Sequence, residues 1–535
     1  MDWADELAAS VSGSQVVNDS KTPSGTVHVG SLRGPVVHDA VWRALRDRGV
    51  EAQFLYGVDD LDPMDSQALL TPDAVDRFMG VPLADVPAPA GSSAPSYARH
   101  FVGSLFLPTF DRLGIRPRIY WMSELYRDGT MDRWIRQALD RASVIRDIYR
   151  AVSHSEKSAT WLPISVICER CGRIGTTDAF DWDGETVAYR CLPDLVPWAQ
   201  GCGMSGRVAP FRGGAKLKFN VDWAAKWSEF GVTVEGCGKD LATAGGSRDR
   251  SDAVSRAVFD REPPVNVVYE FLNIGGRKMS TSKGTGAAAH TIAEVVPPEQ
   301  LRFLFLRPRP NSAIEFNPDG TDAIPRLFDE FDRIAAAANG REVKGELPPN
   351  PGRLFALSMV DADADVEAEA ALYRPPFLHL SLIVQTGRDP HRYFADEKGS
   401  ELTAREHEIL DERIESVSIW LANFAPESAR YRVALADMPA EVARLADEQR
   451  LYLEALALAA EANPPTTGDA WQTLIFDTAT AAGLAPGRAF GALYIAFLGR
   501  PNGPRAGWLL ASLQPVFVLE RLRQAGGAHA TGATR

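Results

Sequence analysis

Two glycine-bearing segments, far apart in the chain, carry residues that could handle phosphate. The first is PSGTVHVGS (23–31), which places small residues and His28 where a short apolar strand gives way to a helical pattern. Free backbone N–H groups and the positive end of a helix dipole favour an anion at such a turn. Gly25 and Gly30 would let a base or a phosphate approach the backbone, and His28 could donate to a phosphate oxygen. Alone, this pattern also fits nucleotidyl transferases and ordinary strand-to-helix turns.

The second segment, GGRKMSTSKGTG (275–286), is basic and follows a predicted strand. Arg277, Lys278 and Lys283 stand among glycines and hydroxyl residues, so this loop could close over a triphosphate. Its cations would then lie where negative charge develops when a carboxylate attacks the α-phosphorus of ATP. Loss of one such donor typically costs ~3–4 kcal/mol. A flexible basic surface loop is the alternative interpretation.

Four of the five cysteines fall within one short stretch. Cys168 and Cys171 form a CERCG knuckle, and Cys191 and Cys202 follow. Four thiolates suit a structural zinc ion, and a disulfide framework is not expected in a large intracellular protein. The ten residues between the last two cysteines exceed the usual two to four, so free buried thiols are the alternative. Cys237 stands apart and is predicted to be a buried thiol.

Strands and helices must bring these residues together, and the first segment reads as a βαβ unit. A strand is predicted at 15–18, a helix over about 31–48 and a second strand over 52–58. Pro35 falls in the first helical turn, where a missing N–H is tolerated, and Gly49 is a natural stop. Parallel strands joined by helices predict an open, doubly wound sheet with its ligand beyond the carboxyl ends of the strands.

Helical patterns return at 96–113 and 132–152. The stretch 155–212, which holds the four clustered cysteines, is turn-rich and resembles an insertion. A strand is predicted at 265–274, directly before the second phosphate segment.

The C-terminal part of the chain is predicted to be helical. Helices are expected at 298–310 and 324–338, followed by a polar, Pro/Gly-rich linker at 339–352. The remainder to about residue 525 has helical periodicity and short turns. The last ten residues, 526–535, are expected to be disordered.

Bulk composition describes an ordinary soluble globular protein. With 535 residues, 45% hydrophobic and 24% charged, the chain should form two to four domains. It has no apolar run of membrane-spanning length and no basic-then-apolar N-terminus, so we expect a cytoplasmic protein without a membrane partner. The net charge of −13 neither indicates nor excludes a nucleic-acid partner. Arginines cluster at two places where a local basic surface is possible: Arg133, Arg136, Arg141 and Arg146, and Arg302, Arg307 and Arg309. A solvated helix face or a few ion pairs is the alternative interpretation of each cluster.

Together the two phosphate segments resemble the HIGH and KMSKS signatures of class I aminoacyl-tRNA synthetases. HVGS (28–31) stands for the first and KMSTS (278–282) for the second, with Ser31 in place of the usual His or Asn and Thr281 in place of the central Lys. The form KMSTSKG is similar to that of class I lysyl-tRNA synthetases. TPSGTVHVG, DDLDPMD, SELY, GKD with GGS, YEF and LFDEFDRI also occur in that family's order.

The resemblance implies an α/β fold: a Rossmann-type parallel-sheet catalytic domain with a zinc-ribbon-like insertion, then an all-helical anticodon-binding domain. It divides the chain into the first half of the catalytic domain (1–154), the zinc-binding insertion (155–212), the second half of the catalytic domain (213–275), the KMSKS loop with a connecting helical region (276–345), the anticodon-binding domain (346–525) and a tail (526–535).

The resemblance also implies the site residues. The catalytic groups would be His28, Lys278 and Lys283. ATP would be bound by Pro23, Ser24, Gly25, His28, Gly30, Ser31, Lys278, Met279, Ser280, Ser282 and Lys283. The amino acid would be bound by Ser20, Thr22, Trp223, Asp240 and Tyr269. Structural zinc would be bound by Cys168, Cys171, Cys191 and Cys202.

The implied activity is ATP- and Mg²⁺-dependent activation of lysine and its transfer to tRNA(Lys), by a protein expected to be a monomer. A lysine ammonium needs a counter-ion, for which Asp222, Glu270, Asp60 and Asp62 are candidates. Ser20 and Leu241 replace a Gly and a His that many family members carry, and both bear on the choice of amino acid. The alternatives are a paralogue that activates an amino acid without tRNA, a catalytically inactive RNA-binding protein with a zinc ribbon, and a small nucleotidyltransferase.

Overall fold

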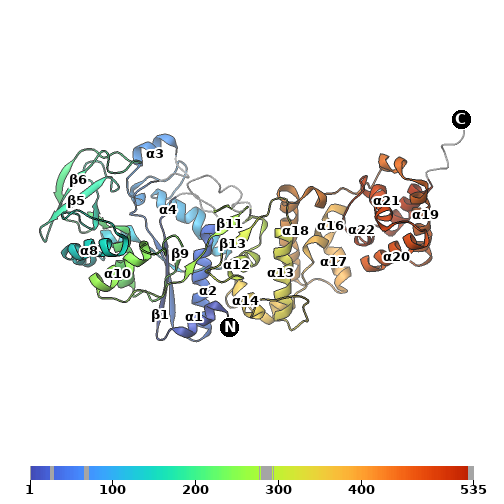
Figure 1. The fold of residues 1–535 in the computed structure, drawn as a ribbon, viewed down its shortest axis with the longest axis horizontal. Helices are drawn as coiled ribbons and strands as arrows, with labels where there is room; N and C mark the ends of the chain where they lie inside the picture. The colour runs from blue at the N-terminus through green and yellow to red at the C-terminus, as the bar shows by residue number, and fades with distance from the viewer. Residues whose placement is uncertain are drawn as a thin grey trace. The chain divides into compact units, whose positions relative to one another are not determined.

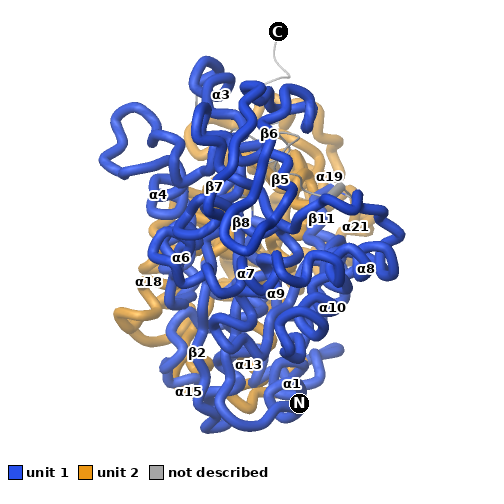
Figure 2. Tube along the Cα trace, turned by 90° about the vertical axis from the view of Figure 1, so that its left-hand side faces the viewer, with its two compact units in different colours: residues 1–293, 298–316, 344–366 blue, residues 294–297, 317–343, 367–535 orange. Residues whose placement is uncertain are grey.

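The computed structural model describes residues 2–24, 29–65, 71–275, 277–278, 292 and 294–527. It consists of two compact units (Figure 2). Unit 1 comprises residues 1–293, 298–316 and 344–366, and unit 2 comprises 294–297, 317–343 and 367–535. Residues 344–366, which begin in the predicted linker, therefore belong to unit 1. The predicted disordered tail lies outside the described residues from position 528 onward.

A parallel sheet organises unit 1 (Figure 1). Strands β1 (Gln15–Lys21), β2 (Ala52–Val58) and β3 (Arg118–Trp121) pair in the order β1-β2-β3, all parallel. Parallel bridges from Val17 to Val234 and from Val234 to Val265 extend the sheet on the other side of β1. Those segments continue into the parallel pair β9 (Cys237–Gly238) and β10 (Val268–Tyr269). The sheet thus extends on both sides of β1, and the prediction of an α/β fold is confirmed.

The burial of β2 agrees with its place between β1 and β3 in the sheet. The last five residues of β2 are all buried, as expected for a strand covered on both faces. Helix α2 (Arg33–Asp47) follows a 3₁₀ turn at Val29–Leu32 and buries Val37, Val41 and Leu45. The predicted helix and second strand are confirmed within two residues, whereas β1 extends three residues further than predicted.

The other helices of unit 1 have these bounds: α1 (Trp3–Ser10), α3 (Pro72–Phe78), α4 (Tyr97–Phe101), α5 (Leu107–Arg112), α6 (Met122–Arg127), α7 (Asp132–Asp140), α8 (Ala142–Ser153), α9 (Phe219–Phe230), α10 (Ser247–Phe259), α12 (Pro298–Leu306) and α14 (Pro351–Ser358). The pattern at 96–113 contains one wide π turn at Val102–Phe106. Pro108 lacks the N–H that would bond back to Ser104, which favours a wider turn there.

The predicted insertion is an antiparallel module. Strands β5 (Thr177–Trp182), β6 (Val187–Cys191) and β7 (Ser205–Val208) form a meander, and β4 (Ile164–Val166) pairs with β8 (Ala215–Leu217) at its base. In Figure 1 the meander lies at the edge of the molecule, beyond α8.

The prediction of a single strand at 265–274 is wrong, because this segment contributes strands to two different sheets. Strand β10 ends at Tyr269, and the N–H of Glu270 donates to the carbonyl of Pro310. The chain then forms β11 (Leu272–Ile274), which pairs in parallel with β13 (Ile314–Phe316) and antiparallel with β12 (Arg277–Lys278).

Unit 2 is helical, and no strand occurs among its described residues. Its helices are α13 (Ala323–Ala338), α15 (Val366–Ala371), α16 (Phe377–Thr386), α17 (Pro390–Lys398), α18 (Ala404–Asn423), α19 (Asp447–Ala462), α20 (Gly468–Ala481), α21 (Pro486–Leu498), α22 (Ala506–Ala511) and α23 (Pro515–Gly526). Leu453, Ile475 and Leu493 are buried in a core shared by α19 to α23. Within the described ranges, no helix combines the length and apolar character needed to cross a membrane.

Candidate active site

A cavity of about 260 Å³ opens at the carboxyl ends of the parallel strands of unit 1. It lies where β1 has β2 on one side and the 234–238 segment on the other, the switch point at which open α/β sheets bind ligands. The lining residues are Asp19, Ser20, Lys21, Thr22, Ser24, Asp59, Phe219, Trp223, Glu235, Gly236, Cys237, Leu241 and Tyr269.

Most of the predicted amino-acid-binding residues meet at this cavity. Ser20, Thr22, Trp223 and Tyr269 all line it, and they come from the end of β1, from α9 and from β10. Asp240 is exposed and is not among the lining residues. Two aromatic side chains from different elements thus face one pocket with polar groups at its rim.

Glu235 is a buried acidic residue that lines the cavity, and it is not among the residues predicted from the sequence. Its carboxylate accepts hydrogen bonds from the indole N–H of Trp223 at 2.9 Å and of Trp227 at 2.6 Å. Only 2% of Glu235 is exposed, and burial raises its pKa. Two tryptophans four residues apart on one helix face, followed by an acidic residue, are the only signal that could have found it.

The predicted counter-ions are engaged elsewhere. Asp222 and Asp62 both pair with Lys216, at 3.1 and 2.9 Å. Asp60 accepts from Ser123, and Glu270 pairs with Lys239 at 2.6 Å. None of the four carboxylates is among the described residues that line the cavity.

A buried ion pair lies at the cavity instead. Lys226 of α9 lies 2.7 Å from Asp59 at the end of β2, and its ammonium is 3.4 Å from the hydroxyl of Ser20. Both charges are almost fully buried. Since an unpaired buried charge is costly, each partner holds the other in place and fixes α9 against the sheet.

His38 holds the opposite wall. Its Nε2 accepts the backbone N–H of Gly236 at 2.8 Å, and its Nδ1 lies 2.8 Å from the carbonyl of Gly34. Nδ1 therefore donates to the carbonyl of Gly34, and it lies 3.6 Å from the carboxylate of Asp19. The ring also meets Tyr269 edge-on, with centroids 6.4 Å apart.

The first phosphate segment lies beside this cavity. Ser24 lines it, and Gly30 and Ser31 belong to the 3₁₀ turn that leads into α2. Pro23 precedes Ser24 at the end of β1, while Gly25 and His28 lie outside the described residues. The 3₁₀ turn with Gly30 and Ser31 thus leads into the N-terminus of α2, whose helix dipole favours an anion.

The second phosphate segment begins at β12. The backbone of Lys278 pairs with Asn273 of β11. Met279, Ser280, Ser282 and Lys283 lie outside the described residues.

Arg33 connects the two phosphate-handling regions. Its guanidinium donates to the carbonyls of Glu270 at 2.6 Å, Ser312 at 2.8 Å and Pro310 at 3.1 Å. Arg33 is two residues beyond Ser31, and only 1% of it is exposed. The start of α2 is therefore fixed to the chain segments that enter β11 and β13.

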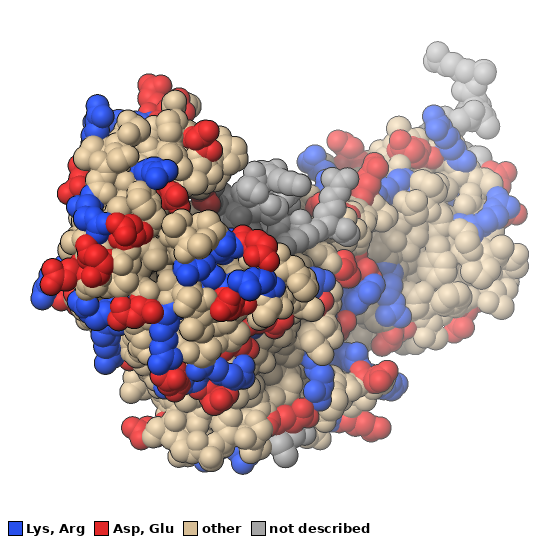
Figure 3. All heavy atoms as spheres, turned by 60° about the vertical axis from the view of Figure 1, so that its left-hand side comes forward, with Lys and Arg blue, Asp and Glu red and all other residues tan. Residues whose placement is uncertain are grey.

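The prediction of a basic surface at Arg302 is wrong. Arg302 is fully buried, pairs with Asp39 at 2.7 Å and donates to the carbonyl of Leu357. Arg133 and Arg146 are also engaged, with Glu229 and with the carbonyl of Trp161. On the face drawn in Figure 3, basic and acidic side chains are interspersed.

The four clustered cysteines meet at one point. Their sulfur atoms all lie within 4.8 Å of one another, and the pairs Cys168–Cys202 and Cys171–Cys191 are 3.6 Å apart. A disulfide requires sulfurs about 2.05 Å apart, whereas sulfurs around a tetrahedral zinc with Zn–S of about 2.3 Å lie roughly 3.8 Å apart. This donor set fits a metal ion. Cys237 is buried away from it, as predicted, but lines the cavity at the switch point of the sheet.

Comparison with known proteins agrees with this geometry. The family model of class I tRNA synthetases (K) matches residues 1–353. The lysine–tRNA ligase of Methanosarcina barkeri is 34% identical, covering 98% of this chain and 97% of that one. Those of Archaeoglobus fulgidus (33%, covering 98% and 100%) and Methanocaldococcus jannaschii (31%, covering 97% and 99%) are similar over the same extent. The chain therefore belongs to the class I tRNA synthetases of the K family.

Proposed function

We propose that this protein is a lysine–tRNA ligase, which activates lysine with ATP and transfers it to the 3′-terminal adenosine of tRNA(Lys). The observation that carries the proposal is the cavity at the sheet's switch point. Trp223 and Tyr269 supply flat apolar walls for a methylene stem, and Glu235 and Asp19 supply negative charge for ammonium groups. The ligases named above share this chain's whole length and carry the same activity in their names.

In the first step the lysine carboxylate attacks the α-phosphorus of ATP, giving lysyl-adenylate and pyrophosphate. His28, Gly30 and Ser31 would bind phosphate at the start of α2, and Lys278 and Lys283 would neutralise charge on the leaving pyrophosphate. Mg²⁺ would share that charge. No protein nucleophile is required, so catalysis would rest on positioning and electrostatics.

In the second step the 2′-hydroxyl of the terminal adenosine attacks the carbonyl carbon of lysyl-adenylate, so an ester bond to the tRNA forms, the bond to the phosphate breaks and AMP leaves. Unit 2 would hold the distal part of the tRNA. A structural zinc ion would be held by Cys168, Cys171, Cys191 and Cys202. It would link the CERCG knuckle, which follows β4, to the end of β6. Four thiolates leave no open coordination position, so the metal would not take part in the reaction. We expect a cytoplasmic monomer.

ATP–pyrophosphate exchange, run with each amino acid in turn and with or without total tRNA, tests the proposal. Lysine-dependent exchange followed by acid-precipitable lysyl-tRNA is the expected result. Exchange with lysine but no charging of any tRNA would instead identify a paralogue that activates an amino acid alone. No exchange with any amino acid, even with tRNA present, would identify an inactive RNA-binding protein.

A further inference from the structure

The cavity at the switch point of the sheet has a basic lining residue whose ammonium group lacks a partner. Lys21 is the only lysine or arginine among the described residues that line this cavity, and it is half-buried. No hydrogen bond or ion pair joins its ammonium to another described residue. Two lysines nearby are paired instead, Lys226 with Asp59 and Lys239 with Glu270. Because a charge withdrawn from water is costly without a counter-charge, Lys21 favours an anionic group of a ligand.

The alternation of β1 shows which face of the sheet Lys21 occupies. Asp19 and Lys21 are two residues apart on this strand, so both side chains point to the same face. The first turns of α2 cover that face, since the carboxylate of Asp19 lies 3.6 Å from His38 and a Cβ on Gly34 would lie 3.2 Å from it. Burial lowers the pKa of Lys21, and the charge of Asp19 opposes this shift. Lys21 follows Asp19 toward the carboxyl end of the strand, and therefore toward the start of α2.

The charges that line the cavity are the opposite of those on free lysine. The acidic lining residues are Asp19, Asp59 and Glu235, and the basic one is Lys21. Asp59 is neutralised by Lys226 at 2.7 Å, which leaves two carboxylates and one ammonium group. Lysine carries two ammonium groups and one carboxylate. Such a match of opposite charges favours this amino acid and sets the direction in which it binds.

The positions of Glu235 and Lys21 along the sheet suit the length of this ligand. The parallel bridge between Val17 and Val234 puts Glu235 level with Asn18 of β1. Lys21 lies three residues further along β1, which corresponds to about 10 Å at the usual rise of a strand. This separation is comparable with the length of an extended lysine. One ammonium group can therefore lie near Glu235 while the carboxylate lies near Lys21.

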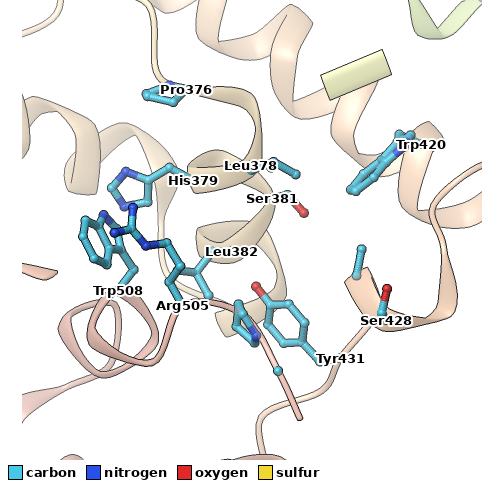
Figure 4. Close-up of a pocket in the computed structure, with 13 residues that line it drawn as sticks. Pro376, Leu378, His379, Ser381, Leu382, Trp420, Ser428, Tyr431, Arg505 and Trp508 are labelled. Carbon is cyan, nitrogen blue, oxygen red and sulfur yellow. The ribbon is translucent and has the colours of Figure 1, made fainter. Parts of the chain in front are cut away.

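The cavity of about 560 Å³ in unit 2 has no such set of charges (Figure 4). Its described lining residues include Arg505 but no Asp or Glu. In Figure 4 the guanidinium of Arg505 lies between the rings of Trp508 and His379. That cavity therefore offers no counter-ion to the ammonium groups of lysine.

We propose that Lys21 binds the α-carboxylate of the substrate lysine and holds it next to the α-phosphate of ATP. The ammonium groups of the substrate then meet Asp19 and Glu235. When a carboxylate oxygen bonds to the α-phosphorus and the bond to pyrophosphate breaks, the carboxylate loses its charge. Lys21 then lies beside the oxygens of the α-phosphoryl group, so it keeps a negative partner through the step. This proposal rests on the proposed function and names the residue that positions its nucleophile.

The test compares lysine with lysinamide, which has the same side chain but lacks the carboxylate. The Kd of each is measured by isothermal titration calorimetry on the full-length protein without ATP. Lys21→Met should raise the Kd for lysine about tenfold or more, because a charge-assisted hydrogen bond is lost. The Kd for lysinamide should not rise, which also shows that the pocket of the variant is folded.

Two further variants complete the comparison. Lys21→Arg keeps the positive charge and should recover most of the affinity for lysine. Lys157→Met alters a half-buried lysine of unit 1 that does not line the cavity, and it should bind both compounds as the wild type does.

The same titrations can overturn the proposal. If Lys21→Met weakened lysine and lysinamide equally, or weakened neither, Lys21 would not bind the carboxylate. A rise in the Kd for ATP with an unchanged Kd for lysine would place the ammonium on a phosphate instead. Each of these results is compatible with lysine-dependent exchange by the wild type, so the proposed function would stand. A wild type that binds no lysine would overturn both.

Discussion

The guanidinium of Arg33 donates to the carbonyl of Glu270 across 237 positions of the chain. It holds the first turn of α2, which follows the first phosphate segment, against the strand that leads to the second. Both segments must reach one ATP in the proposed reaction. This contact therefore fixes the start of α2 to the segment that enters β11, although Arg33 is not among the described residues that line the cavity.

Replacing Arg33 with Ala should impair activation more than it unfolds the protein. The carbonyls of Glu270 and Ser312 would lose their donor, at a cost of roughly 1–3 kcal/mol for each left unsatisfied, whereas the carbonyl of Pro310 would keep the N–H of Glu270. We expect the exchange rate at saturating lysine to fall at least tenfold, since small misplacements of reacting groups are costly. Arg33→Lys should recover only part of the lost exchange rate, because an ammonium group cannot reproduce the planar, forked set of hydrogen bonds that a guanidinium donates. Arg48→Ala, an exposed arginine just beyond α2, is the control and should keep full activity.

Gly34→Ala should weaken lysine binding. A Cβ at this position would lie 2.7 Å from the hydroxyl of Tyr269 and 3.2 Å from a carboxylate oxygen of Asp19, so the pocket wall must shift. The KM for lysine should rise about tenfold while the KM for ATP changes less. Gly487→Ala, where the new methyl group meets nothing within 4 Å, should leave both constants unchanged. A Gly34→Ala enzyme with the wild-type KM for lysine would show that Tyr269 does not form the pocket wall.

Glu235→Gln should disturb the tryptophan wall of the cavity. A carboxylate can accept from both indoles, whereas the amide group of Gln would turn its NH₂ toward one of them. We expect the KM for lysine to rise at least tenfold, with a change in tryptophan fluorescence. Glu229→Gln alters a carboxylate that also accepts from an indole, that of Trp134, but lies away from the cavity. If both variants had the same effect, the cavity would not be the lysine site.

The sequence predicts the secondary structure around this site better than it predicts which charged residues are buried there. Strand β2 falls where the pattern places it, because a run of apolar residues between a helix stop and an acidic turn has few alternatives. The cysteine cluster is predicted from the CERCG knuckle and the two cysteines that follow it. The wide spacing of Cys191 and Cys202 does not separate them, because the β6–β7 turn brings them together. The sequence does not predict the role of Glu235, because its partners Trp223 and Trp227 lie on one face of a different element, α9. Only the fold brings the carboxylate of Glu235 to the cavity. Arg302, predicted at the surface, is buried because Asp39 on another helix neutralises it, and sequence spacing carries no sign of that pair.

Cys202→Ser should release the metal. Zinc content, measured by mass spectrometry on extensively dialysed protein, should fall from about one ion per chain to well below that, and the Tm should drop. Cys237→Ala is the control, since that thiol lies outside the cluster, and this variant should keep the zinc content of the wild type. Wild-type protein without stoichiometric zinc would leave the cluster as four free thiols.

Asp60→Asn should stabilise the protein, and only above mildly acidic pH. Burial raises the pKa of Asp60 to about 6 although Ser123 donates to its carboxylate through both N–H and Oγ. The same carboxyl titrates near 3.8 in the unfolded chain. Between these values the folded protein holds a proton that the unfolded chain has lost, so the contribution of Asp60 to stability falls as the pH rises and is lowest above pH 6.

An asparagine at position 60 carries no charge at any pH, and its carbonyl can still accept the N–H of Ser123. The variant should exceed wild type by up to ~3 kcal/mol in free energy of unfolding at pH 7.5, which corresponds to a shift of about two pKa units. This advantage should shrink toward zero at pH 4. Thermal melts across this pH range measure it, with Asp111→Asn as the exposed control. A difference between Asp60→Asn and wild type that does not change over this pH range would mean that the pKa of Asp60 is not raised in the folded protein, and that the hydrogen bonds from Ser123 offset the effect of burial.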